Sequence, residues 1–343
     1  MKKHLFYISF FLLLVACKHS NNAVKPAHSG AAGEIIVVCS EDVWSGVIDS
    51  VCRDVFQYYL PMLPQPEPAF TILHYTPEQF SMILERHRNI IQIVVDPNRK
   101  DPDAKFNLLK DKWSKEQLVL DIEARTAQEV SELLYKNGPD VVAAINAKEN
   151  ERLSWLFSSY STKPIMSMVS KKFGADIIIP KGFELAKDSL DFLWLKREKS
   201  RNLSGNMYYI IQNLVVYTRP YDSDSSFSDH EILQHRDRFV KMIPGPSKGS
   251  YMTTVYSFQE MDLYPEGTNV DINGNYGRFI RGLWKMENDF MGGPFISLST
   301  YDEANNRILT IEGDVFAPKF DKREYLRELE SIIFSLKFNL KND

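Results

Sequence analysis

Apolar positions in the first half of the chain alternate between two spacings, which predicts interleaved strands and helices. Short apolar runs typical of buried strands occur at residues 35–39, 69–75, 89–95 and 118–122. Between the first two runs, residues 43–59 carry apolar side chains at helical spacing. Residues 34–161 are therefore predicted to form an N-terminal α/β domain.

Capping boxes predict two more helices in this domain. Thr76 is followed three residues later by Gln79, and Thr126 by Glu129. We expect one helix to begin at each threonine. The second is expected to break near Gly138, because proline follows it, and then to continue to about residue 160.

The second half of the chain, residues 162–343, is richer in strand patterns. Candidate strands lie at residues 177–179, 192–196, 208–217, 251–256, 276–286, 295–301 and 308–316. A helix is expected from Ser228, and a final helix capped by Asp321 and Glu324 has one apolar face. The predicted fold class is α+β, with two α/β-type domains. The second has a mainly antiparallel sheet covered by the C-terminal helix.

The N-terminus has the pattern of an export signal. Two lysines precede an apolar run that is too short to span a bilayer and ends in Leu-Val-Ala-Cys. This ending resembles a bacterial lipobox, so residues 1–16 are predicted to be a signal peptide and Cys17 the lipidated residue. Residues 17–33, rich in Ala, Ser, Asn and Gly, are predicted to be a flexible tether.

Composition excludes some partners. The chain has 41 basic and 45 acidic residues and a net charge of −4, which gives no general attraction to nucleic acid. The basic run Lys196–Arg201 is interpreted as a solvated loop between strands. Cys39 and Cys52 remain after lipidation of Cys17. They either form a disulfide or serve as two small buried hydrophobic residues.

Several segments, including GEIIVVCSEDVW, RGLW and MGGPF, resemble an uncharacterised family of Bacteroidota lipoproteins described as a domain of unknown function. The resemblance extends from Gly33 to the C-terminus. It implies a lipid-anchored protein of the cell envelope, and the absence of an acidic cluster after Cys17 favours a periplasm-facing one. It implies no catalytic residue.

No catalytic, metal or cofactor motif stands out. His230 and His235 are five residues apart on a predicted helix, about 140° around its axis, so they do not form a chelating pair. The sequence contains no nucleophile motif of the G-x-S-x-G type. We therefore predict no catalytic residues, no metal and no cofactor.

The region from residue 276 to 314 is the best candidate for a ligand site. Arginine, tryptophan and a glycine loop lie beside a predicted polar sheet face, which suits a small anionic or polar ligand. The candidate residues are Arg278, Arg281, Trp284, Asp289, Gly292, Gly293 and Glu312. A second interpretation, which we favour, makes Gly292-Gly293 a strained turn and pairs the arginines with Glu312 and Asp314 across strands.

The expected function is that of a non-enzymatic binding or assembly module. Its partners are expected to be the bilayer, through Cys17, and an envelope protein or small polar ligand. The alternative is an envelope hydrolase whose carboxylate pair the sequence does not identify.

Overall fold

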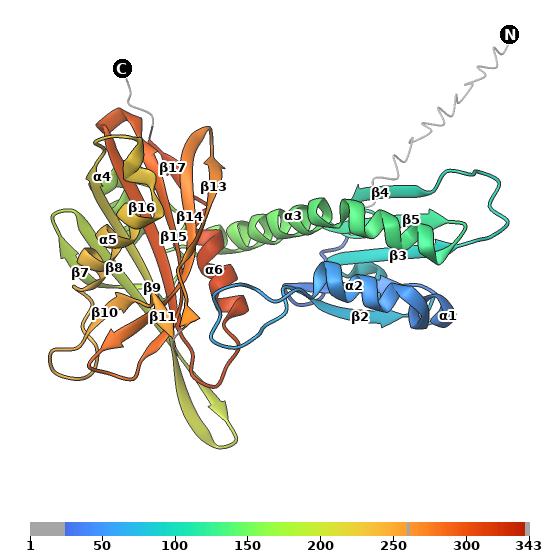
Figure 1. Ribbon diagram of the computed structural model, residues 1–343, viewed down its shortest axis with the longest axis horizontal. Coiled ribbons are helices and arrows are strands. Elements are labelled where there is room, and N and C mark those ends of the chain that lie inside the picture. Colours follow the sequence, from blue (N-terminus) through green and yellow to red (C-terminus); the bar gives the residue numbers. More distant parts are fainter. Residues whose placement is uncertain (1–24, 259–260, 340–343) are drawn as a thin grey trace, which may run out of the picture.

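The computed structural model describes residues 25–258 and 261–339. The predicted signal peptide and Cys17 lie outside the described residues. The fold is α+β with two domains, as predicted (Figure 1). Within the described part of the chain, no helix is both long and apolar enough to cross a membrane.

The N-terminal domain contains a five-stranded sheet in the order β2-β1-β3-β5-β4. Its first four strands are parallel, and the edge strand β4 is antiparallel to β5. The strands are β1 (Glu34–Val38), β2 (Thr71–Tyr75), β3 (Asn89–Val95), β4 (Lys105–Lys110) and β5 (Leu118–Ala124). Ile35 and Val37 face one core, and Ile36 and Val38 face another, as strand alternation requires.

Four helices cover one face of this sheet. They are α1 (Glu41–Val43), η1 (Trp44–Ile48), α2 (Asp49–Phe56) and α3 (Ala127–Ser159). Thr126 caps α3 by accepting a hydrogen bond from the backbone N of Glu129, as predicted. The predicted break near Gly138 is wrong, because α3 continues through Pro139. A Cβ on Gly138 would lie 2.4 Å from Val55 Cγ1, so glycine allows α2 and α3 to approach closely.

The helix predicted from Thr76 is also wrong. Gln79 Oε1 accepts a hydrogen bond from Thr76 N at 2.9 Å, so one half of the capping box forms. The chain then makes a turn and the short helix η2 (Leu84–Arg86). This segment instead covers the second face of the sheet, where Phe80 packs beside Ile36.

The C-terminal domain is built on an antiparallel sheet of eight strands. Its order is β10-β14-β15-β16-β9-β8-β7, with β13 also paired to β14. The strands are β7 (Glu184–Ser189), β8 (Phe192–Leu203), β9 (Asn206–Pro220), β10 (Tyr251–Thr254), β13 (Glu266–Ile272), β14 (Asn275–Glu287), β15 (Gly292–Asp302) and β16 (Arg307–Phe316). Short pairs complete the domain, namely β6 (Ala175–Asp176) with β17 (Lys337–Phe338) and β11 (Ser257–Phe258) with β12 (Met261–Asp262).

Helices cover both faces of this sheet. The predicted C-terminal helix, α6 (Arg323–Ile333), lies across one face together with α4 (Lys163–Phe173). The other face is covered by α5 (Asp229–Val240), which Ser228 caps as predicted. The single-turn helices η3 (Asp224–Phe227) and η4 (Glu303–Asn305) lie in loops.

Strands β8 and β9 form a long hairpin whose tip extends past its neighbours (Figure 1). Strand β7 pairs with β8 only as far as Lys196, and β16 pairs with β9 only as far as Ile211. The basic run Lys196–Arg201 lies within β8, so its interpretation as a loop is wrong. Arg197 within this run is 5% exposed and donates to Gln212 Oε1 at 2.7 Å.

The two domains meet where α6 crosses α3 (Figure 1). Glu67 of the N-terminal domain caps α6, since its carboxylate accepts from the backbone N of Lys322 and of Arg323 at 2.7–2.9 Å. The predicted cap, Asp321, makes no such bond. α3 joins both cores, with Val141 in the N-terminal core and Phe157 in the C-terminal core.

Part of the predicted tether belongs to the folded body. The backbone N of Ser29 donates to Arg86 O at 2.8 Å, and Lys115 N donates to Pro26 O at 2.8 Å. A Cβ on Gly30, whose φ is +91°, would lie 2.2 Å from His87 Nε2. We call residues 25–33 the N-terminal strap. It places the start of the folded body near residue 25 instead of residue 34.

Candidate functional site

The predicted ligand residues do not converge. Arg278 and Arg281 are three positions apart on β14 and therefore lie on opposite faces of the sheet. Arg278 faces α5, where its Nε and Nη2 donate to the Asp229 carboxylate at 2.7 and 2.8 Å. Arg281 faces α6, where its Nη2 donates to Glu330 Oε2 at 2.7 Å.

Glu312 is sealed inside the C-terminal domain. Its carboxylate accepts from Nε and Nη2 of Arg236 on α5 at 2.9 and 2.7 Å, and neither side chain is exposed. The predicted pairing of the β14 arginines with Glu312 and Asp314 is therefore wrong. The correct partner of Glu312 comes from a helix 76 residues away.

The role of the next three candidates is in packing, namely Trp284, Gly292 and Gly293. Trp284 is 2% exposed in the core beneath α5. A Cβ on Gly293 would lie 2.0 Å from Val315 O, so only glycine fits there. Both glycines lie within β15, and the predicted strained turn is instead at Asn288, whose φ is +62°.

Asp289 lies on the exposed loop that follows. There its carboxylate accepts from the backbone N of Ser247 at 3.0 Å. The Ser247 side chain, whose hydroxyl also donates to this carboxylate, holds the pKa of Asp289 below its usual value. Asp289 lies in the loop beyond the end of β14, with seven residues between it and Arg281 along the chain.

The polar face predicted for β15 and β16 exists but is buried. Ser297, Ser299, Thr310, Glu312 and Asp314 are each at most 1% exposed beneath α5. Burial, with a smaller effect of Glu312, raises the pKa of Asp314 to about 7. Burial raises the pKa of Glu312 as well, so both carboxyl groups have raised pKa values, but a substrate has no access to them.

Arg281 does line a cavity, which lies between the two domains and which we call the arginine groove. Its volume is about 280 Å³. The groove is lined by Tyr58, Leu60, Pro61, Leu63, Asn146, Asn150, Arg281, Arg323, Leu326, Arg327 and Glu330. Three arginines thus face a single carboxylate. Sequence reasoning found only one of them, because the other two are brought there by the packing of α6.

Arg327 is the least well paired of these arginines. It is 8% exposed, and its Nη2 and Nη1 reach Ala69 O and Asn146 Oδ1 only at 3.3 and 3.4 Å. Its Nε lies 3.5 Å from Glu324 Oε2 but is not aligned to donate a hydrogen bond. A nearly buried cation with such long contacts is incompletely compensated for its lost hydration.

The other two groove arginines have firmer partners. Arg323 donates to Pro68 O and Glu324 Oε1, both at 2.7 Å. Burial raises the pKa of Tyr58, although Arg281 and Arg327 act in the opposite direction. The Tyr58 hydroxyl is therefore protonated at neutral pH and is available as a hydrogen-bond donor.

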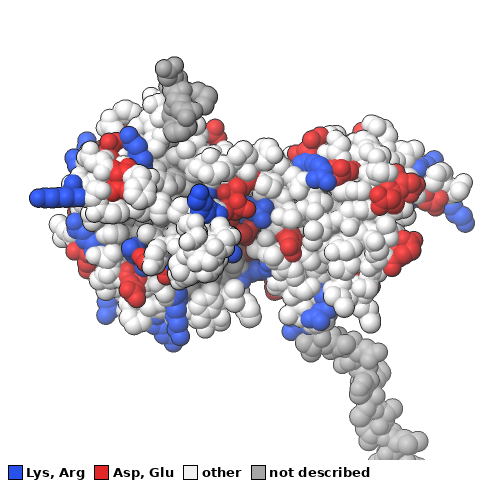
Figure 2. Space-filling model, turned by 90° about the horizontal axis from the view of Figure 1, so that it is seen from below, with Lys and Arg blue, Asp and Glu red and all other residues white. Residues whose placement is uncertain are grey.

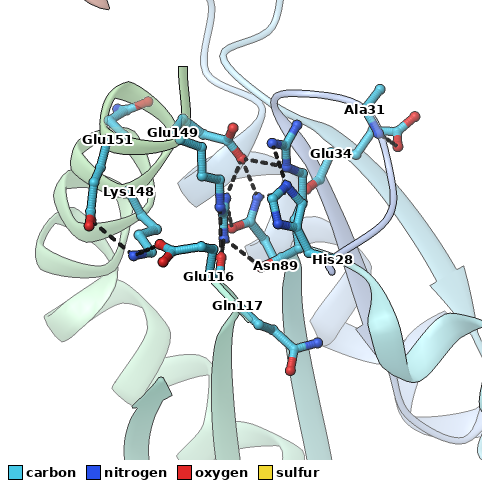
Figure 3. A network of polar contacts seen from close by, with 12 residues as sticks. His28, Ala31, Glu34, Asn89, Glu116, Gln117, Lys148, Glu149 and Glu151 are labelled. Atoms are coloured by element: carbon cyan, nitrogen blue, oxygen red, sulfur yellow. Dashed lines mark hydrogen bonds and ion pairs between the residues drawn. The ribbon is translucent and has the colours of Figure 1, made fainter. Parts of the chain in front are cut away.

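A second buried cluster of arginines lies behind the groove, between α3 and β3 (Figure 3). Glu149, which is fully buried, accepts from Arg152 Nη1 at 2.7 Å and from Asn89 Nδ2 at 2.9 Å. Arg88 Nε lies 3.3 Å from the same Glu149 oxygen without a hydrogen bond, and Glu149 Oε2 has no partner.

Arg152 is fully hydrogen-bonded, since its guanidinium also donates to Asn89 Oδ1, Arg88 O and Glu116 O, whereas Arg88 is less well paired. Burial lowers the pKa of Arg152 to about 10, and it also lowers the pKa of Arg88. Arg327 of the groove lowers the pKa of Arg88 further. Arg88 Nη2 also contacts His28 Nε2 of the strap at 3.1 Å.

The junction therefore gathers several arginines, of which Arg327 and Arg88 have few well-aligned acceptors. Figure 2 shows basic and acidic side chains side by side near the waist between the two lobes. Such a site attracts an anion, because guanidinium groups donate well to carboxylate and phosphate oxygens.

The remaining sequence candidates supply no chemistry. Cys39 and Cys52 are both buried and free. Burial raises the pKa of Cys39 to about 12 and raises that of Cys52 as well, so neither thiol ionises at neutral pH. In residues 25–258 and 261–339, no group of three or more His, Cys, Asp or Glu side chains is placed to hold a metal ion.

Residues 162–335 match the family model described as "Domain of unknown function (DUF4837)", and residues 28–158 match "Domain of unknown function (DUF8532)". No curated protein matches the chain. Among solved structures, a mutant of the protein Mog1 shows 10% identity and a TM-score of 0.29, covering 49% of this chain and 92% of that chain. The Saccharomyces cerevisiae Ran-binding protein Mog1p shows 11% identity and a TM-score of 0.30, covering 48% and 90%.

Proposed function

The chain belongs to the family described as domain of unknown function DUF4837, and we propose that it is a lipid-anchored envelope protein that binds an anionic ligand in the arginine groove. It acts in this proposal as a binding or assembly module without catalysis. The observation that carries the proposal is Arg327, a nearly buried guanidinium that faces the groove with contacts of 3.3–3.5 Å only.

The anchoring part of the proposal rests on the sequence. The charged and apolar segments before Cys17 have the form of a lipoprotein signal, and the absence of an acidic cluster after Cys17 favours a periplasm-facing location. Because the strap is bound to the N-terminal domain, the linker between Cys17 and the folded body is about residues 18–24. Such a short linker keeps the body close to the bilayer.

The groove favours a ligand that combines an anionic group with an apolar part. The arginines supply bidentate donors, and Tyr58 and Asn146 add further polar groups. The opposite part of the lining is apolar, with Leu60, Pro61, Leu63 and Leu326. A volume of about 280 Å³ admits a small molecule or one terminal group of a larger partner.

The alternative, a hydrolase with a carboxylate pair, has less support. The pair Glu312 and Asp314 lies beneath α5, and both residues are 0% exposed. Hydrolysis needs both carboxyl groups within reach of the bond that is cleaved. Their burial supports a structural role for this pair.

Binding of phenyl phosphate, measured by calorimetry with phenol as the neutral control, tests the proposal. Arg281→Gln should weaken binding about tenfold, because a charge-assisted hydrogen bond contributes about 1.5–3 kcal/mol. Glu330→Gln should strengthen binding several-fold, because it frees Arg281 from its partner at 2.7 Å. Arg238→Gln, at an exposed arginine on α5, is the matched control.

Opposite effects of the two groove variants are the expected signature. Binding of phenyl phosphate that is equal in all four proteins, or no binding at all, would overturn the groove as the site. Lipidation is tested separately: Cys17→Ser should abolish incorporation of labelled fatty acid, and incorporation that persists would contradict the anchor.

A further inference from the structure

A cavity beside α5 is separate from the arginine groove and has a volume of about 720 Å³. One stripe of α5 forms its first wall, and the chain that leads into β13 forms the second. The lining residues are Asp229, His230, Leu233, Gln234, Asp237, Arg238, Tyr256, Tyr264 and Pro265. We call this cavity the tyrosine cleft.

Apolar and aromatic surfaces form the body of the tyrosine cleft. Leu233 and Pro265 are buried and form its inner part. The rings of Tyr256 and Tyr264 lie 5.9 Å apart and are inclined by 54°. Tyr264 is 63% exposed, so one face of its ring is open to a ligand.

The two carboxylates of the cleft, Asp229 and Asp237, already accept hydrogen bonds from neighbouring side chains. Both Asp229 oxygens accept from Arg278 at 2.7 and 2.8 Å. Asp237 accepts from the Thr254 backbone N, the Thr254 hydroxyl and the Tyr256 hydroxyl at 2.7–2.9 Å. A cationic ligand therefore finds no carboxylate with spare acceptor capacity.

Further polar side chains lie at the rim, and one of them, Arg238, is cationic. His230 and Gln234 are exposed and hydrogen-bonded to each other at 2.8 Å. Arg238 is exposed and makes no hydrogen bond or ion pair with another residue in the described ranges. These side chains offer donors and acceptors arranged around an aromatic platform.

From this arrangement we propose that the tyrosine cleft binds a neutral saccharide. The apolar face of a sugar ring stacks on the open Tyr264 ring, because aromatic faces pack well against polarised C–H groups. The hydroxyl groups of the sugar then bond to Gln234, His230 and Arg238 at the rim. The balanced carboxylates disfavour a cationic ligand, and the uncharged hydroxyl groups of a sugar suit the mixed donors and acceptors of the rim, whereas the ligand proposed for the arginine groove is an anion.

Saturation-transfer NMR of the purified protein with chitotriose and with maltotriose tests this proposal. At least one of these neutral trisaccharides should bind with a Kd in the millimolar range or better, about 10 mM at most. Tyr264→Ala should weaken that binding about tenfold, and Gln234→Ala a few-fold. The control is Tyr209→Ala, an equally exposed tyrosine on the β8–β9 hairpin.

Three results would overturn the proposal. The first is that neither trisaccharide binds. The second is that Tyr264→Ala binds the sugar as well as the unaltered protein and the control Tyr209→Ala do. The third is stronger binding of benzyltrimethylammonium than of either sugar, lost in Tyr264→Ala, which makes the cleft a cation site. Since phenyl phosphate binding depends on Arg281, the two sites can fail independently.

Discussion

Each domain contains a buried cluster of arginine and glutamate, and the two clusters differ in their balance. In the C-terminal domain one arginine meets one glutamate: Arg236 and Glu312 pair bidentately at 2.7 and 2.9 Å. In the N-terminal domain two arginines, Arg88 and Arg152, share one oxygen of Glu149, whose other oxygen has no partner.

The pKa values follow this difference. Burial alone lowers the pKa of a guanidinium, but the contacts with Glu312 outweigh it and raise the pKa of Arg236. In the N-terminal cluster burial prevails and lowers the pKa of Arg152 to about 10. The pair of Arg236 and Glu312 needs no further partner. The arginines beside the arginine groove share one glutamate oxygen, and a bound anion would supply the missing partner.

The largest effect should come from breaking the matched pair. Arg236→Met leaves the Glu312 carboxylate buried without a cation and should lower the free energy of unfolding by about 3–5 kcal/mol. The double variant Arg236→Met/Glu312→Leu removes both charges and should recover most of the loss. Urea unfolding measures both, and a double variant as unstable as the single one contradicts a closed pair.

In the N-terminal cluster, loss of the glutamate should lower the free energy of unfolding more than loss of one arginine. Glu149→Gln leaves Arg88 and Arg152 without a carboxylate and should cost about 3 kcal/mol, whereas Arg88→Met removes the surplus cation and should cost about 1 kcal/mol. Added phosphate should stabilise Glu149→Gln more than the unaltered protein, because an anion replaces the missing charge. Thermal unfolding with and without phosphate measures this, and equal losses in both variants contradict the comparison.

Local patterns predicted most of the elements in both domains. The strand alternation of β15 and β16 and the caps at Thr126 and Ser228 involve residues within a few positions of one another, and the structure confirms them. The edge strand β4 was missed because its side chains are mostly exposed and leave no apolar run.

The candidate site was only partly predictable, because its contacts are remote in sequence. Glu67 caps α6 from 255 residues away, and α6 brings Arg323 and Arg327 to Arg281. A strand pattern identifies which face Arg281 occupies but not which helix covers that face. The same limit explains why Arg236 was not recognised as the partner of Glu312.

Asp314 is the one unmatched carboxyl group beside the closed pair, and it should make stability depend on pH. Its pKa is raised to about 7 in the folded state, so its contribution is fully present below about pH 4 and is lost as the pH rises through 7. The expected loss between pH 4 and 8 is on the order of 4 kcal/mol. Denaturant unfolding should show this slope, and Asp314→Asn should flatten it. An unchanged slope in Asp314→Asn would assign the pH dependence to other groups.

The smallest effect is expected where the N-terminal strap meets the unmatched cluster. Burial, together with Arg88 and Arg152, lowers the pKa of His28, so the neutral ring that contacts Arg88 at 3.1 Å stabilises the strap at pH 7. For a lowered pKa, this contribution is present above the unfolded value of 6.5 and is lost as the pH falls through the folded one.

Hydrogen exchange of the Ser29 amide, which donates to Arg86 O, reports on this contact. After correction for the intrinsic rate, its protection should fall a few-fold between pH 7 and pH 5, corresponding to about 0.5–1 kcal/mol of local stability. His28→Gln cannot gain the second positive charge and should keep its protection at pH 5. The exposed His230→Gln should behave like the unaltered protein. If His28→Gln also loses protection at low pH, protonation of another group releases the strap. The arginines of the N-terminal cluster then do not cause its pH dependence.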